Sequence, residues 1–269
     1  MPEVKPPEQN CCIEFDDVYL RFDENEVLKG VSFLVPHGQT KVLLGVAGSG
    51  KSLILKLAMG LLAPDSGRIY VLGEEVTAKT EEEMFELRRK VGIVFQESAL
   101  FDSLTVEDNV GYRLLEEHVA KNEIDRRVTE ALRFVELEHT LTKFPSELSG
   151  GMRRRVAIAR AIITEPDVLL YDSPTGGLDP VTSTTIVELV VKERDIARTT
   201  ALLVTHRLQD AFTMATSYWD QSKNLMGPAP VGVNTNTSFI LMRDGKIIFD
   251  GSAPELGRSK DEYIREYIS

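Results

Sequence analysis

The 269-residue sequence predicts an α/β fold in which helices cover both faces of a mostly parallel sheet. Short apolar runs alternate with segments of helical periodicity, as in strands joined by crossover helices. A glycine-rich stretch, residues 45–52, lies between an apolar run and a helical run. From about Val106 to Leu148 the chain becomes charged and helix-like, which predicts a helical insert in the α/β core.

Composition restricts the function and the setting of the chain. Hydrophobic residues make up 42% of the sequence, enough for a sizeable core. The formal net charge of −11 argues against binding along a nucleic-acid backbone. The two cysteines, Cys11 and Cys12, are adjacent and make no disulfide framework, which favours a reducing compartment. No apolar run approaches the roughly 18 residues that span a bilayer, so we expect a soluble protein.

Local patterns predict the elements in order. Residues 1–11 are polar and rich in proline, so we expect them to be disordered and a single domain to cover residues 12–269. A loop is expected at 221–238, where Gly, Pro, Asn and Thr gather. The expected strands are 13–18, 27–35, 41–44, 68–73, 91–95, 167–172 and 200–205, with a hairpin of 239–242 and 246–249. The expected helices are 53–58, 80–90, 150–164, 181–197 and 261–268.

The C-terminal part, about residues 239–269, consists of that hairpin and the last helix. The helix carries apolar residues on one face: Tyr263, Ile264, Tyr267 and Ile268. Docking of this face on the core is the favoured interpretation, and a contact with a second subunit is the alternative.

Residues 45–52 carry a motif with a defined chemistry. The spacing G-x-x-x-x-G-K-S, in a strand–loop–helix context, is that of a phosphate-binding loop. Its backbone N–H groups and the helix N-terminus would point at phosphate oxygens, Lys51 would reach the β- and γ-phosphates, and the Ser52 hydroxyl would ligate Mg²⁺. The sequence therefore predicts binding of ATP with Mg²⁺. The expected nucleotide contacts are Gly45, Val46, Ala47, Gly48, Ser49, Gly50, Lys51 and Ser52.

A carboxylate is expected beside this loop. Asp172 ends the apolar run 167–172, which predicts a position at the carboxyl end of a buried strand. There it would hold the Mg²⁺ shell, through water. A cap on the following turn is the alternative interpretation of this aspartate.

A further stretch, residues 148–152, has the sequence Leu-Ser-Gly-Gly-Met before an arginine-rich helix and resembles the signature motif of ABC ATPases. By itself, Ser-Gly-Gly before a helix is an N-cap and an anion site. The resemblance covers nearly the whole chain after the first ten or so residues. It implies a RecA-like P-loop core with an antiparallel β edge and an inserted helical subdomain at about 97–163. It also implies that two chains enclose two ATP molecules, each nucleotide being closed over by the other protomer's Ser149, Gly150, Gly151 and Met152.

Other positions match the same family pattern. Gln96 follows a strand as the Q-loop glutamine does, which implies contact with Mg²⁺ or with the attacking water. His206 ends a strand where the family has a histidine on the γ-phosphate. Asp179, in Gly-Leu-Asp, resembles the D-loop, which makes a contact across the dimer. Phe22 matches the aromatic residue that stacks on adenine, and Tyr19 is the alternative.

One position departs from the family. Ser173 stands where most ABC ATPases have the glutamate that polarises the attacking water. A hydroxyl is not a base near neutral pH without a partner, and losing a general base costs about 10²–10⁴ in rate. We expect residual hydrolysis, with His206 and Gln96 orienting the water. The alternatives are a substitute carboxylate, from Glu97 or Asp179, and ATP binding with little turnover.

The segment after Gln96 indicates the kind of transporter. Ser-Ala-Leu-Phe at 98–101, Asn-Val at 109–110 and the run 145–155 resemble the ATPase of Mla/MCE-type phospholipid transporters. This resemblance implies a homodimer on the cytoplasmic face of the inner membrane, a permease that contacts about residues 96–110, and an MCE substrate-binding protein. The alternatives are an importer of another small solute and a soluble ABC assembly factor.

Overall fold

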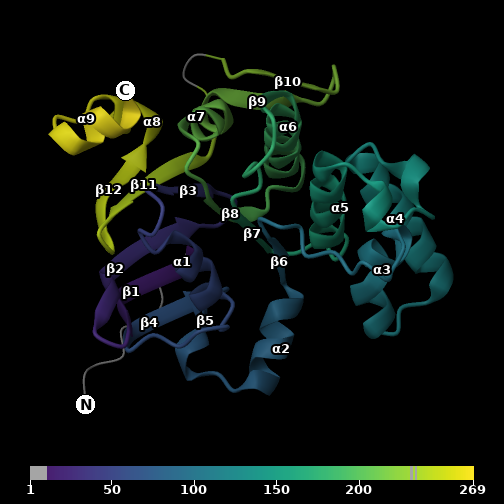
Figure 1. The fold of residues 1–269 in the computed structure, drawn as a ribbon, viewed down its shortest axis with the longest axis horizontal. Helices are drawn as coiled ribbons and strands as arrows, with labels where there is room; N and C mark the ends of the chain where they lie inside the picture. Colours follow the sequence, from purple (N-terminus) through teal and green to yellow (C-terminus); the bar gives the residue numbers. More distant parts are fainter. Residues whose placement is uncertain (1–10, 231–232, 234) are drawn as a thin grey trace.

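A six-stranded sheet forms the centre of the computed structural model, which describes residues 11–230, 233 and 235–269. Its strands lie in the order β12-β11-β3-β8-β7-β6 (Figure 1). The strands from β11 to β6 pair in parallel, and β12 is an antiparallel edge. Their bounds are β3 Thr40–Gly45, β6 Val91–Val94, β7 Val168–Asp172, β8 Thr200–Val204, β11 Thr237–Arg243 and β12 Lys246–Ser252. The carboxyl ends of the parallel strands therefore meet at one edge of the sheet.

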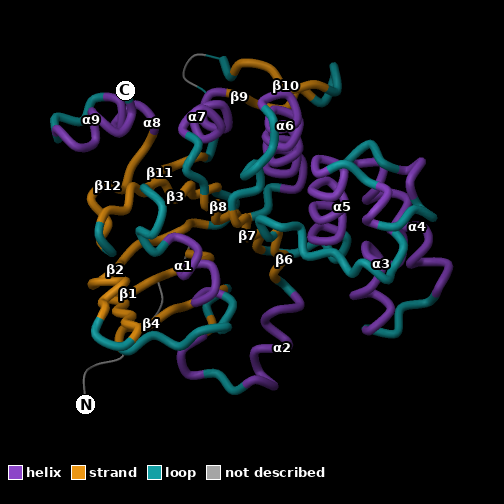
Figure 2. Tube along the Cα trace, viewed as in Figure 1, coloured by secondary structure: helices purple, strands orange, loops and turns teal. Residues whose placement is uncertain are grey.

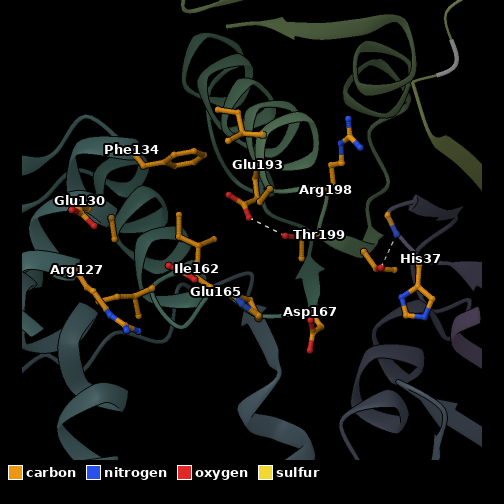
Figure 3. Close-up of a pocket in the computed structure, with 17 residues that line it drawn as sticks. His37, Arg127, Glu130, Phe134, Ile162, Glu165, Asp167, Glu193, Arg198 and Thr199 are labelled. Atoms are coloured by element: carbon orange, nitrogen blue, oxygen red, sulfur yellow. Dashed lines mark hydrogen bonds between the residues drawn. The ribbon is translucent and has the colours of Figure 1, made fainter. Parts of the chain in front are cut away.

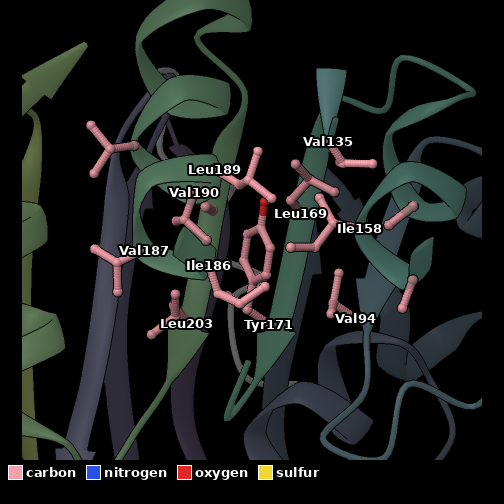
Figure 4. Packing of buried hydrophobic residues seen from close by; sticks show 14 of the residues in the cluster. Val94, Val135, Ile158, Leu169, Tyr171, Ile186, Val187, Leu189, Val190 and Leu203 are labelled. Carbon is pink, nitrogen blue, oxygen red and sulfur yellow. The ribbon is translucent and has the colours of Figure 1, made fainter. Parts of the chain in front are cut away.

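Alternation along these strands divides the hydrophobic core in two, because successive side chains point to opposite faces of a sheet. Leu170 and Leu202 belong to the cluster on one face, and their neighbours Leu169 and Leu203 belong to the cluster on the other. Figure 4 shows the second cluster, where the ring of Tyr171 lies between the strands and the covering helices. Both faces are apolar, as the continuous apolar runs predict for a parallel sheet.

An antiparallel sheet covers the first face. Its strands lie in the order β2-β1-β4-β5, and the helix α1 packs in the same cluster. The buried residues of β1 include Ile13, Phe15 and Val18, and the rings of Phe15 and Phe33 stack. The bounds are β1 Cys11–Phe22, β2 Asn25–Pro36, β4 Ser66–Val71, β5 Glu74–Glu75, α1 Lys51–Ala58 and α2 Glu81–Arg89.

Helices cover the other face and form the insert. The bounds are α3 Val106–Glu116, α4 Lys121–Phe134, α5 Gly150–Ile162, α6 Pro180–Ala197 and α7 Leu208–Thr216. Figure 2 shows α3, α4 and α5 gathered at one side of the sheet, as expected for a helical insert. Thr105 begins α3 as its N-cap, because its hydroxyl accepts the N–H of Asp108 at 3.2 Å. Val110, Val128 and Val156 join these helices in one buried cluster.

Two expectations about irregular segments are wrong in part. Cys11, assigned to the disordered start, begins β1, and residues 1–10 lie outside the described residues. The expected loop 221–238 contains β10 (Leu225–Pro228), which pairs with β9 (Ser217–Asp220). Its short apolar part is too brief to show alternation, so only the turn-forming residues around it gave a signal. Residues 231, 232 and 234 of that segment are outside the described part.

The terminal helix α9 (Glu262–Ile268) docks on the core, preceded by the short α8 (Ala253–Gly257). Ile264 is 3% exposed and joins the cluster that includes β11. This confirms the favoured interpretation of its apolar face. Within the part of the chain that the structure describes, no helix combines the length and the apolar character needed to cross a bilayer.

Candidate nucleotide-binding site

A pocket of about 430 Å³ opens at the carboxyl ends of the parallel strands. The loops that follow β3, β6, β7 and β8 meet here because these strands are parallel neighbours. The sheet topology thus gathers segments that are far apart in the sequence. The residues that line the pocket are Val27, Ala47, Gly48, Gly50, Lys51, Ser52, Leu53, Gln96, Ser173, Val204 and His206.

The glycine-rich loop takes the shape that its motif predicts. It runs from the end of β3 into α1, and Gly50 is the N-cap of that helix. Gly45 has φ +146°, and a Cβ there would lie 2.5 Å from the carbonyl oxygen of Met242 on the neighbouring β11. Only glycine fits this conformation and this close approach. The first residue of the loop is therefore fixed by the strand beside it.

Lys51 is held inside the loop. Its Nζ donates hydrogen bonds to the carbonyls of Gly45 at 2.8 Å and Val46 at 2.7 Å, and to the Ser49 hydroxyl at 3.2 Å. Burial lowers the pKa of Lys51, and the negative charge of Asp172 opposes that shift. A cation on this wall of the pocket suits a phosphate group.

Ser52, at the end of the phosphate loop, and Asp172, at the end of β7, are far apart in the sequence but adjacent in the structure. The Ser52 hydroxyl donates a hydrogen bond to Oδ1 of Asp172 at 2.9 Å. A hydroxyl and a carboxylate side by side are oxygen ligands of the kind that Mg²⁺ prefers, so the donor set fits this ion. Gln96 lines the same pocket and would add an amide oxygen to this donor set. These residues would hold Mg²⁺, which would neutralise phosphate charge when bound.

Gln96, Ser173 and His206 all border the pocket, although more than a hundred residues separate the first from the last. Ser173 is buried, has φ +47°, and donates its backbone N–H to Val204 at 2.9 Å. This bond keeps the segment after β7 against β8. The structure thus brings Ser173, at the position of the usual glutamate, together with the two residues expected to orient the attacking water. Their catalytic roles stay predictions.

The signature residues do not line this pocket. Ser149 is the N-cap of α5, where its hydroxyl accepts the backbone N–H of Met152 at 3.2 Å. Gly150 is exposed, whereas Gly151 is buried against the start of α6. A Cβ on Gly151 would lie 2.3 Å from Cγ2 of Thr182, so the close approach of α5 and α6 requires glycine. The expected contact of this motif with a second protomer's nucleotide stays a prediction.

Asp179 and Phe22 also lie outside the lining residues. Asp179 is the N-cap of α6, where its Oδ1 accepts the backbone N–H of Thr182 at 3.0 Å. The Thr182 hydroxyl also donates to Oδ2 of Asp179, at 2.5 Å. This hydroxyl bond and, to a smaller extent, the backbone bond lower the pKa of Asp179, so its carboxylate is a weak base. Phe22 ends β1 and is 48% exposed, and Tyr19 on the same strand is 37% exposed. Their expected stacking on adenine stays untested.

Sequence reasoning missed several residues of the site. Val27 and Leu53 line the pocket but carry no motif signal, since each is one apolar residue among many. The sequence shows Arg154 only as one of several arginines on a helix, yet its side chain is buried and bonds to the carbonyls of Gln96 and Ser173. An arginine amid the buried face of an amphipathic helix is the signal that could have identified it.

A larger pocket, of about 660 Å³, lies away from this site (Figure 3). It opens where β7 and β8 begin, near Asp167 and Thr199, whereas the chemistry expected from the motifs is at the carboxyl ends. Glu193 on its wall accepts a hydrogen bond from the Thr199 hydroxyl at 3.2 Å. Size alone therefore does not identify the nucleotide site of this chain.

Known proteins resemble this chain in sequence. Residues 28–176 match the family model described as ABC transporter. The chloroplast protein TRIGALACTOSYLDIACYLGLYCEROL 3 of Arabidopsis thaliana is 48% identical over 187 residues, which cover 66% of this chain and 54% of that protein. The probable ribonucleotide transport ATP-binding protein mkl of Mycobacterium tuberculosis is 37% identical over 204 residues, covering 75% of this chain and 56% of that protein. The methionine import ATP-binding protein MetN of Bifidobacterium longum is 39% identical over 178 residues, which cover 66% of this chain and 44% of that protein.

A solved structure resembles the fold. It is the dimeric ATP-binding cassette MJ0796 in a post-hydrolysis state with ADP and Pi, with a TM-score of 0.74 and 28% identity. The likeness covers 89% of this chain and 98% of that one. The chain spans about half the length of the curated relatives it matches. Sequence, fold and site geometry agree, and the chain belongs to the ABC transporter family as an ATPase domain of that family.

Proposed function

We propose that this chain binds and hydrolyses ATP between two copies of itself and thereby drives a separate membrane permease in phospholipid transport. One observation carries the proposal: Lys51 and Ser52, whose hydroxyl is bonded to Asp172, line one pocket together with Gln96 and His206. The family match supports the ATPase, and the similarity to transport proteins supports the coupling to a permease.

The pocket residues suit transfer of the γ-phosphoryl group to water. Lys51 supplies positive charge next to the backbone N–H groups of the loop. Gln96 and His206 border the same space and can orient a water molecule. Ser173 offers a hydroxyl but no base, so we expect slow hydrolysis supported by positioning and phosphate electrostatics. Asp179 is tied to Thr182 as a helix cap, which disfavours it as a substitute base.

A second copy of the chain would complete each site. Ser149 and Gly150 are exposed at the start of α5 but lie outside the lining of the pocket. Backbone N–H groups at this N-terminus suit the γ-phosphate of a nucleotide that another protomer holds. The dimeric state of the solved cassette MJ0796 supports such an arrangement.

A groove of about 590 Å³ supports the contact with a permease. Four aromatic residues line it, and three of them are exposed: Phe85 by 60%, Phe101 by 44% and Tyr112 by 38%. Exposed aromatic side chains rimmed by charge are typical of protein interfaces. Phe101 belongs to the expected contact segment 96–110, and the groove extends this segment to α2 and α3. The charged residues on its rim are Arg88, Arg113, Glu116, Glu117 and Arg160.

The cargo is the finer part of the proposal. The Arabidopsis relative is named after a galactolipid, which supports a lipid cargo. An MCE-type partner is part of the same proposal. The names of the other two relatives refer to ribonucleotide transport and methionine import, so import of another small solute is the competing function. We place the chain on the cytoplasmic face of the inner membrane, bound to the permease.

Purification of the tagged chain from membranes tests this function. We expect a permease, an MCE protein and phospholipid to co-purify, as identified by mass spectrometry. Phe101→Glu should remove the permease, whereas Leu115→Glu, which changes an exposed apolar residue outside the groove, should retain it. An amino-acid permease without lipid would support the importer instead. Absence of any membrane protein would favour an assembly factor.

A further inference from the structure

We propose that Arg154 is a positioning residue that ties the signature helix α5 to the two loops that carry Gln96 and Ser173. The inference rests on the proposed ATP site and concerns how that site is held in shape. Arg154 lies on α5, two positions after Met152 of the signature motif.

The guanidinium of Arg154 bonds to main-chain oxygens of both loops. Its Nη1 donates to the carbonyls of Ser173 at 3.0 Å and Pro174 at 2.9 Å. Its Nη2 donates to the carbonyl of Gln96 and, at 3.5 Å, to that of Gly176. The side chain is only 4% exposed. One side chain of the helical insert therefore joins the segment after β6 to the segment after β7.

This position is costly for the guanidinium cation, because the acceptors of its hydrogen bonds are neutral carbonyls and burial removes the charge from water. Burial lowers the pKa of Arg154, and the charges of Glu97 and Asp172 oppose that shift. An apolar residue could fill the same space without this cost. The arginine therefore provides something that an apolar side chain could not: hydrogen bonds that hold the carbonyls of both loops.

The two loops that Arg154 contacts also lie close to each other. A Cβ on Gly176 would lie 3.1 Å from the carbonyl oxygen of Ser173 and 3.4 Å from Nε2 of Gln96. The Gln96 amide and the Ser173 carbonyl thus both lie beside Gly176. A shift of the guanidinium would move the residues expected to orient the attacking water.

Arg154 also connects the two nucleotide sites of a dimer. It belongs to the same rigid helix as Ser149 and Gly150, which we propose to contact the nucleotide held by the second protomer. A rotation of α5 on closure of that site would reach Gln96 and Ser173 of its own chain through Arg154. The expected consequence is that hydrolysis at one site depends on occupancy of the other.

Arg155 provides a matched control on the same helix. Its Nη1 donates to the carbonyl of Val135 at 3.0 Å, inside the helical insert, and burial lowers its pKa as well. Replacing it removes a partly buried guanidinium–carbonyl bond without touching either loop. An effect that R154Q shows and R155Q does not must therefore come from the lost bonds to the loops of Gln96 and Ser173.

The experiment compares the full-length wild-type chain with R154Q, R154K and R155Q by hydrogen exchange with mass spectrometry. The informative amides are Ser98, bonded to Phe95 at 3.0 Å, and Gly176, bonded to Ser173 at 2.9 Å. We expect R154Q to speed exchange at these amides about tenfold, with R154K intermediate and R155Q unchanged there. Equal exchange in R154Q and wild type, or equal acceleration in R154Q and R155Q, would overturn the proposal.

Nucleotide measurements supply a second arm on the same variants. We expect R154Q to keep its Kd for ATP within about threefold, since Lys51 and Ser52 are untouched, while kcat falls about tenfold. The cooperativity of hydrolysis in ATP should also fall in R154Q. A parallel loss of ATP binding and kcat would assign Arg154 a merely structural role. If the wild type fails to hydrolyse ATP, the proposed function fails, and the exchange arm still decides the role of Arg154.

Discussion

The hydroxyl of Tyr267 accepts a hydrogen bond from the backbone N–H of Gly45 at 3.0 Å. Tyr267 lies on the last helix, and Gly45 opens the phosphate-binding loop 222 positions earlier. Burial raises the pKa of Tyr267, while the bond from Gly45 opposes that shift, so the hydroxyl stays neutral at physiological pH. The C-terminal helix thus buttresses the start of the nucleotide loop of its own chain.

Tyr267→Phe should lower the free energy of unfolding by about 1 kcal/mol, because the N–H of Gly45 loses its partner. The affinity for ATP should fall as well, since the loop begins at that N–H. Urea unfolding and titration with a fluorescent ATP analogue measure the two effects. Tyr263→Phe is the control, because Tyr263 contacts Arg243 through its ring, which phenylalanine keeps. Equal effects of both substitutions would contradict the buttress.

Ser173→Glu should raise steady-state phosphate release by about tenfold or more, because it restores a carboxylate where the family has its general base. Ser173 already has φ +47°, so the substitution replaces one residue with a side chain by another in the same strained conformation. The Lys51→Ala variant sets the background, since it lacks the cation of the loop. Wild-type release no greater than this background would refute residual hydrolysis and support a switch driven by ATP binding.

Gly151→Ala should destabilise the chain by about 1–3 kcal/mol, because the new Cβ would collide with Cγ2 of Thr182. Thr182→Ser removes that methyl group and retains the hydroxyl that bonds to Asp179. The double variant should therefore recover most of the loss, as measured by thermal unfolding of all four proteins. Additive losses in the double variant would show that the close approach of α5 and α6 is not the cause.

Glu193→Gln should change how stability depends on pH. Burial raises the pKa of Glu193, and the hydrogen bond from Thr199 and the positive charge of Lys192 only partly oppose this. The folded chain therefore holds a proton that the unfolded chain releases, so stability falls as pH rises from the ordinary carboxyl pKa through the raised one. The glutamine variant has no carboxyl group at this position, so this fall in stability with rising pH is absent from it. We expect it to be more stable than the wild type near neutral pH, with a smaller difference near about pH 4.

The control for this pH dependence is Glu165→Gln. Glu165 is an exposed residue that lines the same 660 Å³ pocket as Glu193. Its difference from the wild type should change little over that range. Urea unfolding at several pH values measures both variants. A constant difference between Glu193→Gln and wild type across these values would show that burial of this carboxylate has no energetic consequence.

Local motifs made much of the site predictable. The phosphate loop at 45–52, the strand-end Asp172 and the capped start of α5 at Ser149 each depend on spacing over a few residues. Alternation and helical periodicity likewise identified most strands and helices. The short strands β9 and β10 and the helix α7 were missed, since none of them has a long periodic pattern.

The P-loop and the strand-end aspartate can be identified without a structure, because each is specified by a run of consecutive residues. Folding brings Ser52 to Asp172, Arg154 to the loops of Gln96 and Ser173, and Tyr267 to Gly45. These contacts join residues far apart in the chain, and they follow from the parallel order of β3, β8, β7 and β6 and from the packing of helices on that sheet. No local pattern encodes that order.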